Sequence, residues 1–304
     1  MITASIIIGT LNQRELLKKT LESLFAQTYP ADQFEIVLVD SLSNDGTKEM
    51  VNGLKAPCHL NYFRQENKGK VKARNNALRV AQGETIVFTD ADIPCEPNWL
   101  AEHLAAKVKY PNTAFAGQTI RLRREDLTDT ELPTKFKPWQ KIPWSYFLTG
   151  NLSISKELIF KAGLFDESFK EYGWEDIELG YRLNKMGVKL RFLPHALNHH
   201  LHPVSKKDFL TIMFKMGKSA AVFYRRHPNM QIKLFVGMNP LAMGLHSLIQ
   251  RLPKLLKFIE VKAEKSDFAR HILEQYYYLS GIKEALANAW PINNYRQLEC
   301  RKTA

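Results

Sequence analysis

Two aspartates separated by one residue, Asp90 and Asp92, follow directly on the apolar run Thr85–Phe88. In an open α/β sheet, the carboxyl ends of the strands face the ligand crevice. Carboxylates placed so close together repel each other unless a cation lies between them. Oxygen ligands of this kind suit Mg²⁺ or Mn²⁺, which proteins commonly share with the phosphates of a substrate. The spacing therefore predicts a metal-bound, phosphorylated ligand at this edge.

Other groups able to do chemistry follow predicted strands or begin predicted helices. A helix N-terminus with nearby cations suits phosphate, and the segment at residues 67–75 has that character. Acids begin a later helix, and three histidines come after the last predicted strand. The side chains are Asp40, Lys70, Arg74, Glu175, Asp176, His199, His200 and His202.

In their order and spacing, these motifs resemble glycosyltransferase family 2, whose nucleotide-diphospho-sugar transferase fold is called GT-A. The resemblance covers roughly residues 3–203 and rests on residues 8–12, 39–47, 73–75, 89–92 and 173–176. Residues 163–167 and 173–176 also resemble the C-terminal catalytic part of galactosyl- and N-acetylgalactosaminyltransferases.

The resemblance implies a role for each matching residue on the donor side. Thr10 would line the base pocket of a nucleotide, and Asp40 would accept a hydrogen bond from the ring N–H of uracil. The alternative for Asp40 is a turn aspartate. Arg74 would approach the nucleotide, and Asp90 with Ala91 would bind the nucleotide sugar.

The same resemblance implies a metal site for Mn²⁺ or Mg²⁺. Its ligands would be Asp90, Asp92 and His200, with His202 as the alternative to His200. His199 would point the other way if the segment is extended, since successive side chains of a strand alternate.

On the acceptor side, the resemblance implies that Asp176 is the general base of an inverting transfer. Such a carboxylate takes the hydroxyl proton as the acceptor attacks the anomeric carbon. Glu175 would hold an acceptor hydroxyl, and Trp174 would offer a flat face to a sugar ring. The alternative for Glu175 and Asp176 is a helix N-terminus that favours acids through its dipole.

Alternating strand and helix signals must position these residues. Buried strands are expected near residues 5–9, 35–39, 59–63, 84–88, 114–117 and 189–193, with helices between them. Repeated units of this kind predict an α/β fold with a mostly parallel central sheet flanked by helices. We expect a domain over residues 1–204, with a nucleotide-sugar-binding half (1–117), an acceptor-side half (118–204) and a long loop at 118–148.

Residues 205–304 predict a basic helical extension. Residues 205–265 hold twelve Lys or Arg against three acids, although the whole chain carries only +12. This segment either lies on an anionic membrane surface or packs on the core with a solvated basic face. Its most apolar run, residues 234–249, is shorter than the ~20 residues of a spanning helix.

The cysteines and the N-terminal residues indicate the cellular compartment. The three cysteines have neither metal nor disulfide spacing, which fits a reducing compartment. No signal peptide is visible, so we expect a cytoplasmic protein, at the inner face of the membrane if the basic segment binds there.

The expected function is a metal-dependent inverting transfer from a UDP-sugar to a glycan or lipid-linked acceptor, in surface polysaccharide or glycolipid synthesis. The alternatives are a nucleotidyltransferase that forms nucleotide sugars and a non-catalytic module that binds anionic polymer. No nucleic-acid-binding motif is present, so nucleic acid is not an expected partner.

Overall fold

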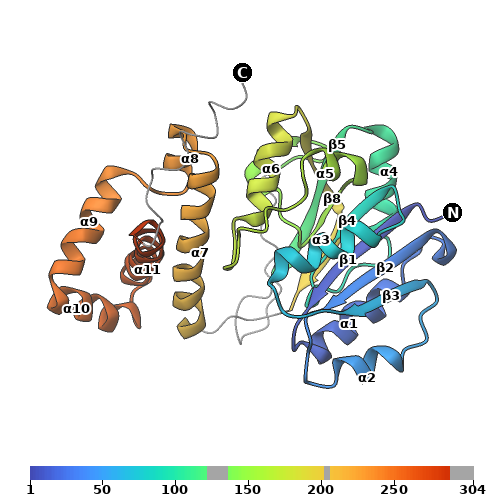
Figure 1. The fold of residues 1–304 in the computed structure, drawn as a ribbon, viewed down its shortest axis with the longest axis horizontal. Coiled ribbons are helices and arrows are strands. Elements are labelled where there is room, and N and C mark those ends of the chain that lie inside the picture. The colour runs from blue at the N-terminus through green and yellow to red at the C-terminus, as the bar shows by residue number, and fades with distance from the viewer. Residues whose placement is uncertain (122–135, 202–205, 288–304) are drawn as a thin grey trace, which may run out of the picture. The chain divides into compact units, whose positions relative to one another are not determined.

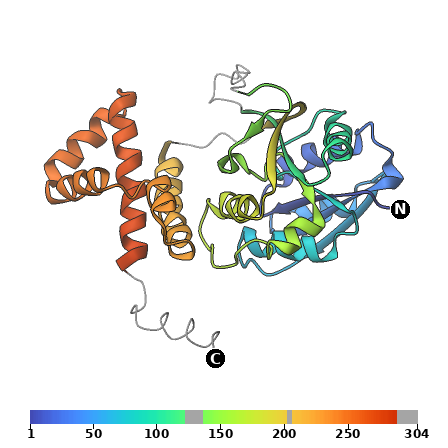
Figure 2. The same ribbon diagram turned by 90° about the horizontal axis from the view of Figure 1, so that it is seen from above.

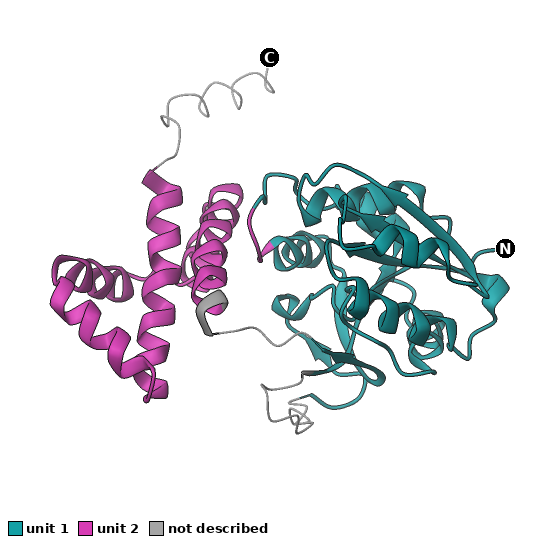
Figure 3. Ribbon diagram, turned by 90° about the horizontal axis from the view of Figure 1, so that it is seen from below, with its two compact units in different colours: residues 1–170, 175–204 teal, residues 171–174, 205–304 magenta. Residues whose placement is uncertain are grey.

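The computed structural model describes residues 1–121, 136–201 and 206–287. The chain forms two compact units (Figure 3). The α/β unit comprises residues 1–170 and 175–204, and the helical unit comprises residues 171–174 and 205–304. The short segment 171–174 thus belongs to the helical unit, although the residues before and after it in the sequence belong to the α/β unit.

The α/β unit is built on one sheet whose described strands lie in the order β3-β2-β1-β4-β7-β5-β8-β6 (Figure 1). The strands β1 to β4 pair in parallel, as do β5 and β8, whereas β7 is antiparallel to β4 and β5. The bounds are β1 (Ala4–Thr10), β2 (Phe34–Asp40), β3 (His59–Arg64), β4 (Thr85–Phe88), β5 (Thr113–Arg121), β6 (Lys141–Ile142), β7 (Leu152–Ser155) and β8 (Lys189–His200). The predicted mostly parallel sheet is confirmed.

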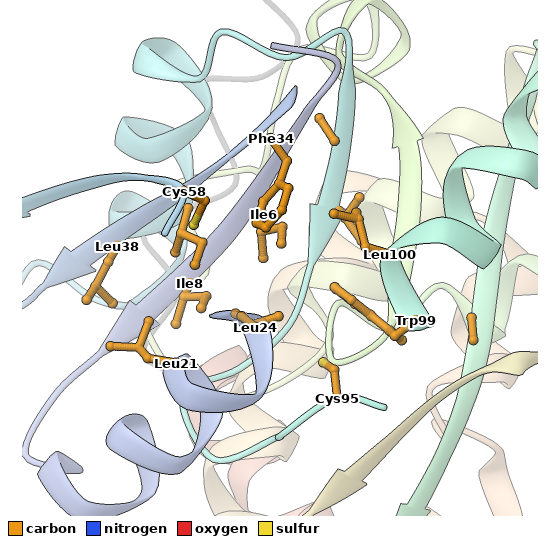
Figure 4. Packing of buried hydrophobic residues seen from close by; sticks show 14 of the residues in the cluster. Ile6, Ile8, Leu21, Leu24, Phe34, Leu38, Cys58, Cys95, Trp99 and Leu100 are labelled. Atoms are coloured by element: carbon orange, nitrogen blue, oxygen red, sulfur yellow. The ribbon is translucent and has the colours of Figure 1, made fainter. Parts of the chain in front are cut away.

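Apolar side chains on both faces hold this sheet between helices. Ile6 and Ile8 on β1 belong to a core cluster with Leu21 of α1 and Trp99 of α4 (Figure 4). Ile7, between them on β1, is also buried, so the strand is covered on both faces. A strand of this kind reads as a continuous apolar run, because neither face meets water. The helices are α1 (Arg14–Phe25), α2 (Thr47–Asn52), α3 (Lys70–Val80), α4 (Trp99–Lys109), α5 (Lys156–Lys161) and α6 (Glu175–Lys185).

The last long strand, β8, continues well beyond the predicted 189–193. Its pairing with β5 shifts register between Gly117 and Gln118, so three residues of β8 including Pro194 bulge out before pairing resumes at Leu197. Proline has no N–H to donate to a ladder and is tolerated at such a bulge. His199 and His200 therefore end the strand, and the expectation that they follow it is wrong.

The predicted long loop at 118–148 is also wrong at both ends. Residues 118–121 extend β5 because they pair with residues 197–200 of β8. The short strand β6 and a 3₁₀ turn at Trp144–Tyr146 lie within the remainder. Residues 122–135 lie outside the described part of the chain.

The helical unit confirms the predicted helical character of the C-terminal segment. Its long helix α11 lies between α7 on one side and α9 and α10 on the other (Figures 1 and 2). Gly217 of α7 and Gly281 of α11 let the two backbones approach, since a Cβ at either position would clash with a carbonyl of the other helix. The helices are α7 (Lys206–Arg226), α8 (Met230–Phe235), α9 (Pro240–Arg251), α10 (Pro253–Ala263) and α11 (Asp267–Ala287). Among the described residues, none of the helices has the length and apolar character needed to cross a bilayer.

Candidate active site

The guanidinium of Arg74 joins two groups of acids that lie far apart in the sequence. Its Nη2 is 3.1 Å from Asp90 Oδ1, just after β4. Its Nη1 is 2.8 Å from Asp176 Oδ1 and 3.3 Å from Glu175 Oε1, at the start of α6. Only 3% of the Arg74 side chain is exposed, so water screens these ion pairs little. The carboxylates predicted for the donor side and for the general base thus both contact the guanidinium of Arg74.

The residue after Arg74 fixes the position of α3 against the turn that precedes α6. Asn75 Nδ2 donates to the carbonyl of Phe165 at 2.9 Å, and the Phe165 N–H donates to Asn75 Oδ1 at 3.1 Å. Such a two-bond clamp orients the helix and hence the neighbouring Arg74. Two neighbouring residues of the sequence motif at 73–75 thus have different roles. Arg74 binds the acids, and Asn75 holds helix α3 in place.

The positive charge of Arg74 opposes the effect of burial on the pKa of Asp90 and of Glu175, with different net results. Burial alone raises the pKa of Asp90, but the nearby cations Lys70 and Arg74 outweigh it and hold the pKa well below its ordinary value. Burial, and then the negative charge of Asp176, raise the pKa of Glu175 although Arg74 opposes them. Asp90 is thus held as an anion, whereas Glu175 takes up a proton more readily.

Thr149 positions the carboxylate of Asp176, and sequence reasoning missed it. The Thr149 N–H and Oγ1 both donate to Asp176 Oδ2, at 3.1 and 2.7 Å. With Arg74 on the other oxygen, both carboxylate oxygens have fixed directions. No local signal marks Thr149, because its role depends on the approach of a segment 27 residues away.

Asp92 and His200 come together from the ends of β4 and β8. His200 Nε2 lies 3.6 Å from Asp92 Oδ2, and only 10% of the Asp92 side chain is exposed. A carboxylate beside an imidazole is a donor set that Mn²⁺ accepts, so the two residues fit a divalent cation. In the turn after β4, Ala91 lies between Asp90 and Asp92; it is buried, and its carbonyl accepts from Thr20 Oγ1 at 2.9 Å.

The predicted three-residue metal set is assembled only in part. Within the ranges that the structure describes, no three His, Cys, Asp or Glu side chains are arranged to hold one ion. The carboxylate of Asp90 is instead bound by Lys70 and Arg74, at 3.2 and 3.1 Å. The expected opposite direction of His199 agrees with the structure, because its Nε2 contacts Glu96 at 2.7 Å. His202 lies outside the described residues.

Thr10 and Asp40 are register partners at the ends of β1 and β2. Thr10 Oγ1 is buried and has no hydrogen-bond partner among the described residues, as expected of an atom that awaits a ligand. Asp40 is fully buried and accepts from the Ser43 N–H, Tyr62 Oη and Arg64 Nε at 2.8, 2.8 and 3.1 Å. Oδ1 thus has the turn role that the sequence leaves open, whereas Oδ2 is bound by two residues of β3, and the contact with uracil remains a prediction.

The acceptor-side residues differ in their surroundings. Glu175 Oε2 is buried and without a hydrogen-bond partner in the described part of the chain. Trp174 belongs to the helical unit, where its ring packs against Phe223, Phe235 and Tyr278 at centroid distances of 6.0, 5.6 and 6.5 Å. These contacts give Trp174 a packing role that the sequence does not predict, and its role as a sugar platform remains a prediction.

With fold and geometry in hand, the chain can be compared with known proteins. It belongs to glycosyl transferase family 2, whose family model matches residues 5–165. A second model, for the N-terminal domain of galactosyltransferase, matches residues 130–206. Membership of this family counts against the two alternatives, a nucleotidyltransferase and a non-catalytic binding module.

Curated relatives carry the same assignment. The protein named Uncharacterized glycosyltransferase YfnE of Bacillus subtilis is 28% identical over 263 residues, which cover 67% of this chain and 66% of that protein. The UDP-Glc:alpha-D-GlcNAc-diphosphoundecaprenol beta-1,3-glucosyltransferase WfaP of Escherichia coli is 27% identical over 190 residues, 62% of this chain and 72% of that protein. Matches to several relatives, such as Escherichia coli chondroitin synthase at 35%, cover less than two thirds of the relative's length.

Solved structures share the GT-A fold. The mannosyltransferase PcManGT from Pyrobaculum calidifontis, in complex with GDP-Man and Mn²⁺, gives a TM-score of 0.63 at 20% identity, covering 94% of this chain and 88% of that one. Staphylococcus aureus TarS 1-349 in complex with UDP gives 0.58 at 18% identity, covering 95% and 93%. At these identities the likeness establishes the fold alone.

Proposed function

We propose that this glycosyltransferase transfers a sugar with inversion from a UDP-sugar to a glycan or lipid-linked acceptor, with a divalent cation, in surface polysaccharide or glycolipid synthesis. The observation that carries the proposal is the bridge through Arg74. It joins Asp90, at the end of β4 where a nucleotide diphosphate is expected, to Asp176, the expected base. In this proposal the donor and the base therefore meet in one site of the α/β unit.

Asp176 takes the proton of the attacking acceptor hydroxyl in this proposal. Its two oxygens are oriented by Arg74 and Thr149, and 15% of its side chain remains exposed. A positioned carboxylate of this kind contributes roughly 10²–10⁴ to a rate. Glu175, with one buried oxygen free of partners among the described residues, binds a hydroxyl of the acceptor.

Asp92 and His200 would hold the cation, with Asp90 as the third ligand through Oδ2, the oxygen that Lys70 contacts at 3.2 Å. A bound cation supplies positive charge beside the leaving diphosphate. The chain's own part is to keep the Asp90 carboxylate ionised, which Lys70 and Arg74 do. Solved neighbours with Mn²⁺ in their titles support this assignment.

The names of relatives support the donor and acceptor classes. TarS has been solved with UDP, and the name of WfaP specifies a UDP-glucose donor and a diphosphoundecaprenol acceptor. Thr10, with its unpartnered Oγ1, and Asp40 would recognise the uracil ring in this chain.

The test is UDP binding by calorimetry with and without Mn²⁺, followed by hydrolysis of a panel of UDP-sugars. We expect Asp92→Ala to abolish the metal-dependent part of UDP binding while the protein stays folded. Asp32→Ala, at an exposed site in the 3₁₀ turn before β2, is the matched control and should bind UDP normally. Unchanged affinity in Asp92→Ala, or a preference for GDP over UDP, would contradict the proposal.

A further inference from the structure

The helix α9 carries a stripe of leucines on the side turned away from the core of the helical unit. Leu241, Leu245 and Leu248 are 86%, 55% and 52% exposed. Their spacing of four and then three residues places them on one face of the helix. Ile249, by contrast, is buried in the core cluster that α9, α10 and α11 share. The stripe therefore contributes little to holding the helix in place.

The next helix, α10, exposes apolar and cationic side chains together. Phe258 and Val261 are 58% and 61% exposed, and the exposed Lys254 and Lys265 continue the same four-three-four spacing. Lys262 Nζ lies 5.7 Å from the centre of the Phe258 ring. Ile259 points instead into the core cluster. The outer side of α10 thus combines large apolar groups with ammonium groups.

The two helices meet at Leu252, itself 45% exposed, and together define what we call the α9–α10 face (Figure 2, in orange). Among the described residues these apolar side chains stay exposed, and soluble proteins rarely leave a large apolar face in water unless it binds a partner. Its members are Leu241, Leu245, Leu248, Arg251, Leu252, Lys254, Leu255, Lys257, Phe258, Val261, Lys262 and Lys265.

Charge selects among the partners that would cover this face. Five exposed cations lie on it, whereas Glu260 and Glu264 are the acids of the same stretch. A second copy of the chain would bring like charges together. Leucine and phenylalanine side chains interleaved with lysine are instead what an amphipathic helix uses to lie in the interface of an anionic bilayer.

We propose that the α9–α10 face binds the surface of a membrane that contains anionic lipids. The apolar side chains enter the acyl boundary while the lysines contact the lipid headgroups. This inference goes beyond the transfer reaction and does not depend on it, because it rests on the helical unit alone. A lipid-linked acceptor would be met at the same surface.

The experiment is flotation of the full-length chain with vesicles of phosphatidylcholine, with or without phosphatidylglycerol. We expect binding to the mixed vesicles only. The charge variant Lys254→Glu/Lys257→Glu/Lys265→Glu should lose roughly tenfold or more of the bound fraction. Its matched control is Lys19→Glu/Lys48→Glu/Lys55→Glu, which makes the same charge change at exposed sites of the α/β unit and should retain binding.

The apolar variant Leu245→Gln/Phe258→Gln/Val261→Gln should also lose binding, whereas Val80→Gln/Val108→Gln, at exposed sites of the α/β unit, should not. UDP-sugar hydrolysis measured in parallel separates loss of docking from loss of the transfer site. Absence of flotation, or equal losses in the controls, overturns the proposal. A dimer that the apolar variant dissociates, without vesicle binding, would show that a second copy covers the face instead.

Discussion

The site around Arg74 and the α9–α10 face depart from the ordinary distribution of side chains in opposite directions. Around Arg74, charged groups are buried or largely buried, and the three acids share Arg74 as an oppositely charged partner. On the α9–α10 face, apolar groups such as Leu241 are left in water. Buried charges are tolerated only with partners, whereas exposed apolar groups cost the fold little. Changes at the site should therefore affect both stability and chemistry, and changes on the face should affect binding alone.

The largest effect is expected at the proposed base. Asp176→Asn keeps the shape of the side chain but removes its ability to take a proton. Transfer should fall by roughly 10²–10⁴, while UDP binding measured by calorimetry stays close to that of the unmodified protein. Asp166→Asn is the control, since Asp166 Oδ1 accepts from the Ser168 N–H at 2.8 Å in a turn that an amide can also make. Near-normal transfer by Asp176→Asn would remove Asp176 from the mechanism.

Removing the guanidinium of Arg74 should destabilise the α/β unit. Arg74→Met leaves Asp90, Glu175 and Asp176 without their common partner, and breaking a buried pair costs about 3–5 kcal/mol. Urea unfolding measures this loss. Lys72→Met on the same helix is the control, because Lys72 and Glu167 are both about a third exposed and such a pair contributes under about 1 kcal/mol. Equal losses in the two variants would show that the Arg74 network does not support the fold.

The pH dependence of stability should contain a contribution from His103 of α4. Its ring is fully buried between Ser153 Oγ, at 2.8 Å from Nδ1, and Asn151 Oδ1, at 2.9 Å from Nε2. Burial lowers the pKa of His103 to about 4 from an ordinary value of 6.5. Between these two pKa values, His103 therefore binds a proton in the unfolded chain but not in the folded protein. The free energy of unfolding consequently decreases as the pH falls from 6.5 to about 4, by up to about 3 kcal/mol.

The variant His103→Gln tests this contribution. It should be less stable at neutral pH because the buried hydrogen bonds change, but its unfolding free energy should depend less steeply on pH in that window. Urea unfolding at pH 7 and pH 5 measures both quantities. Identical slopes for the variant and the unmodified protein would exclude His103 as the source.

The smallest effect is expected for a leucine on the α9–α10 face. Leu245→Ala should change the free energy of unfolding by about 0.5 kcal/mol or less, since the side chain is already 55% exposed. Leu21→Ala in α1, where the side chain is fully buried, should cost about 2–5 kcal/mol. A comparable loss in both, measured by urea unfolding, would show that Leu245 packs within the fold and is not free for a partner.

Local patterns in the sequence were sufficient for the class of fold, and they predicted most residues of the candidate site. The apolar runs at β1, β2 and β4 are buried on both faces, and a strand that meets water on neither face is expected to be mostly apolar. Asp90, Asp92 and Asp176 were identified because acids at a strand end and a helix start, in that order and spacing, form a family's motif. His200 was predicted from the family resemblance, and the alternation of an extended strand predicted the opposite direction of His199, although the strand itself extends further than predicted.

The tertiary structure alone decided how these residues are connected. That Arg74 binds three acids and that Thr149 holds Asp176 depends on segments from 16 to 102 residues apart, so no local pattern encodes it. The length of β8 was set by its pairing with β5, and the exposure of α9 and α10 by which of their faces the core cluster takes up. Local residue preferences act over a few residues, whereas ion pairs, strand pairing and burial depend on distance in space, which exists only once the chain has folded.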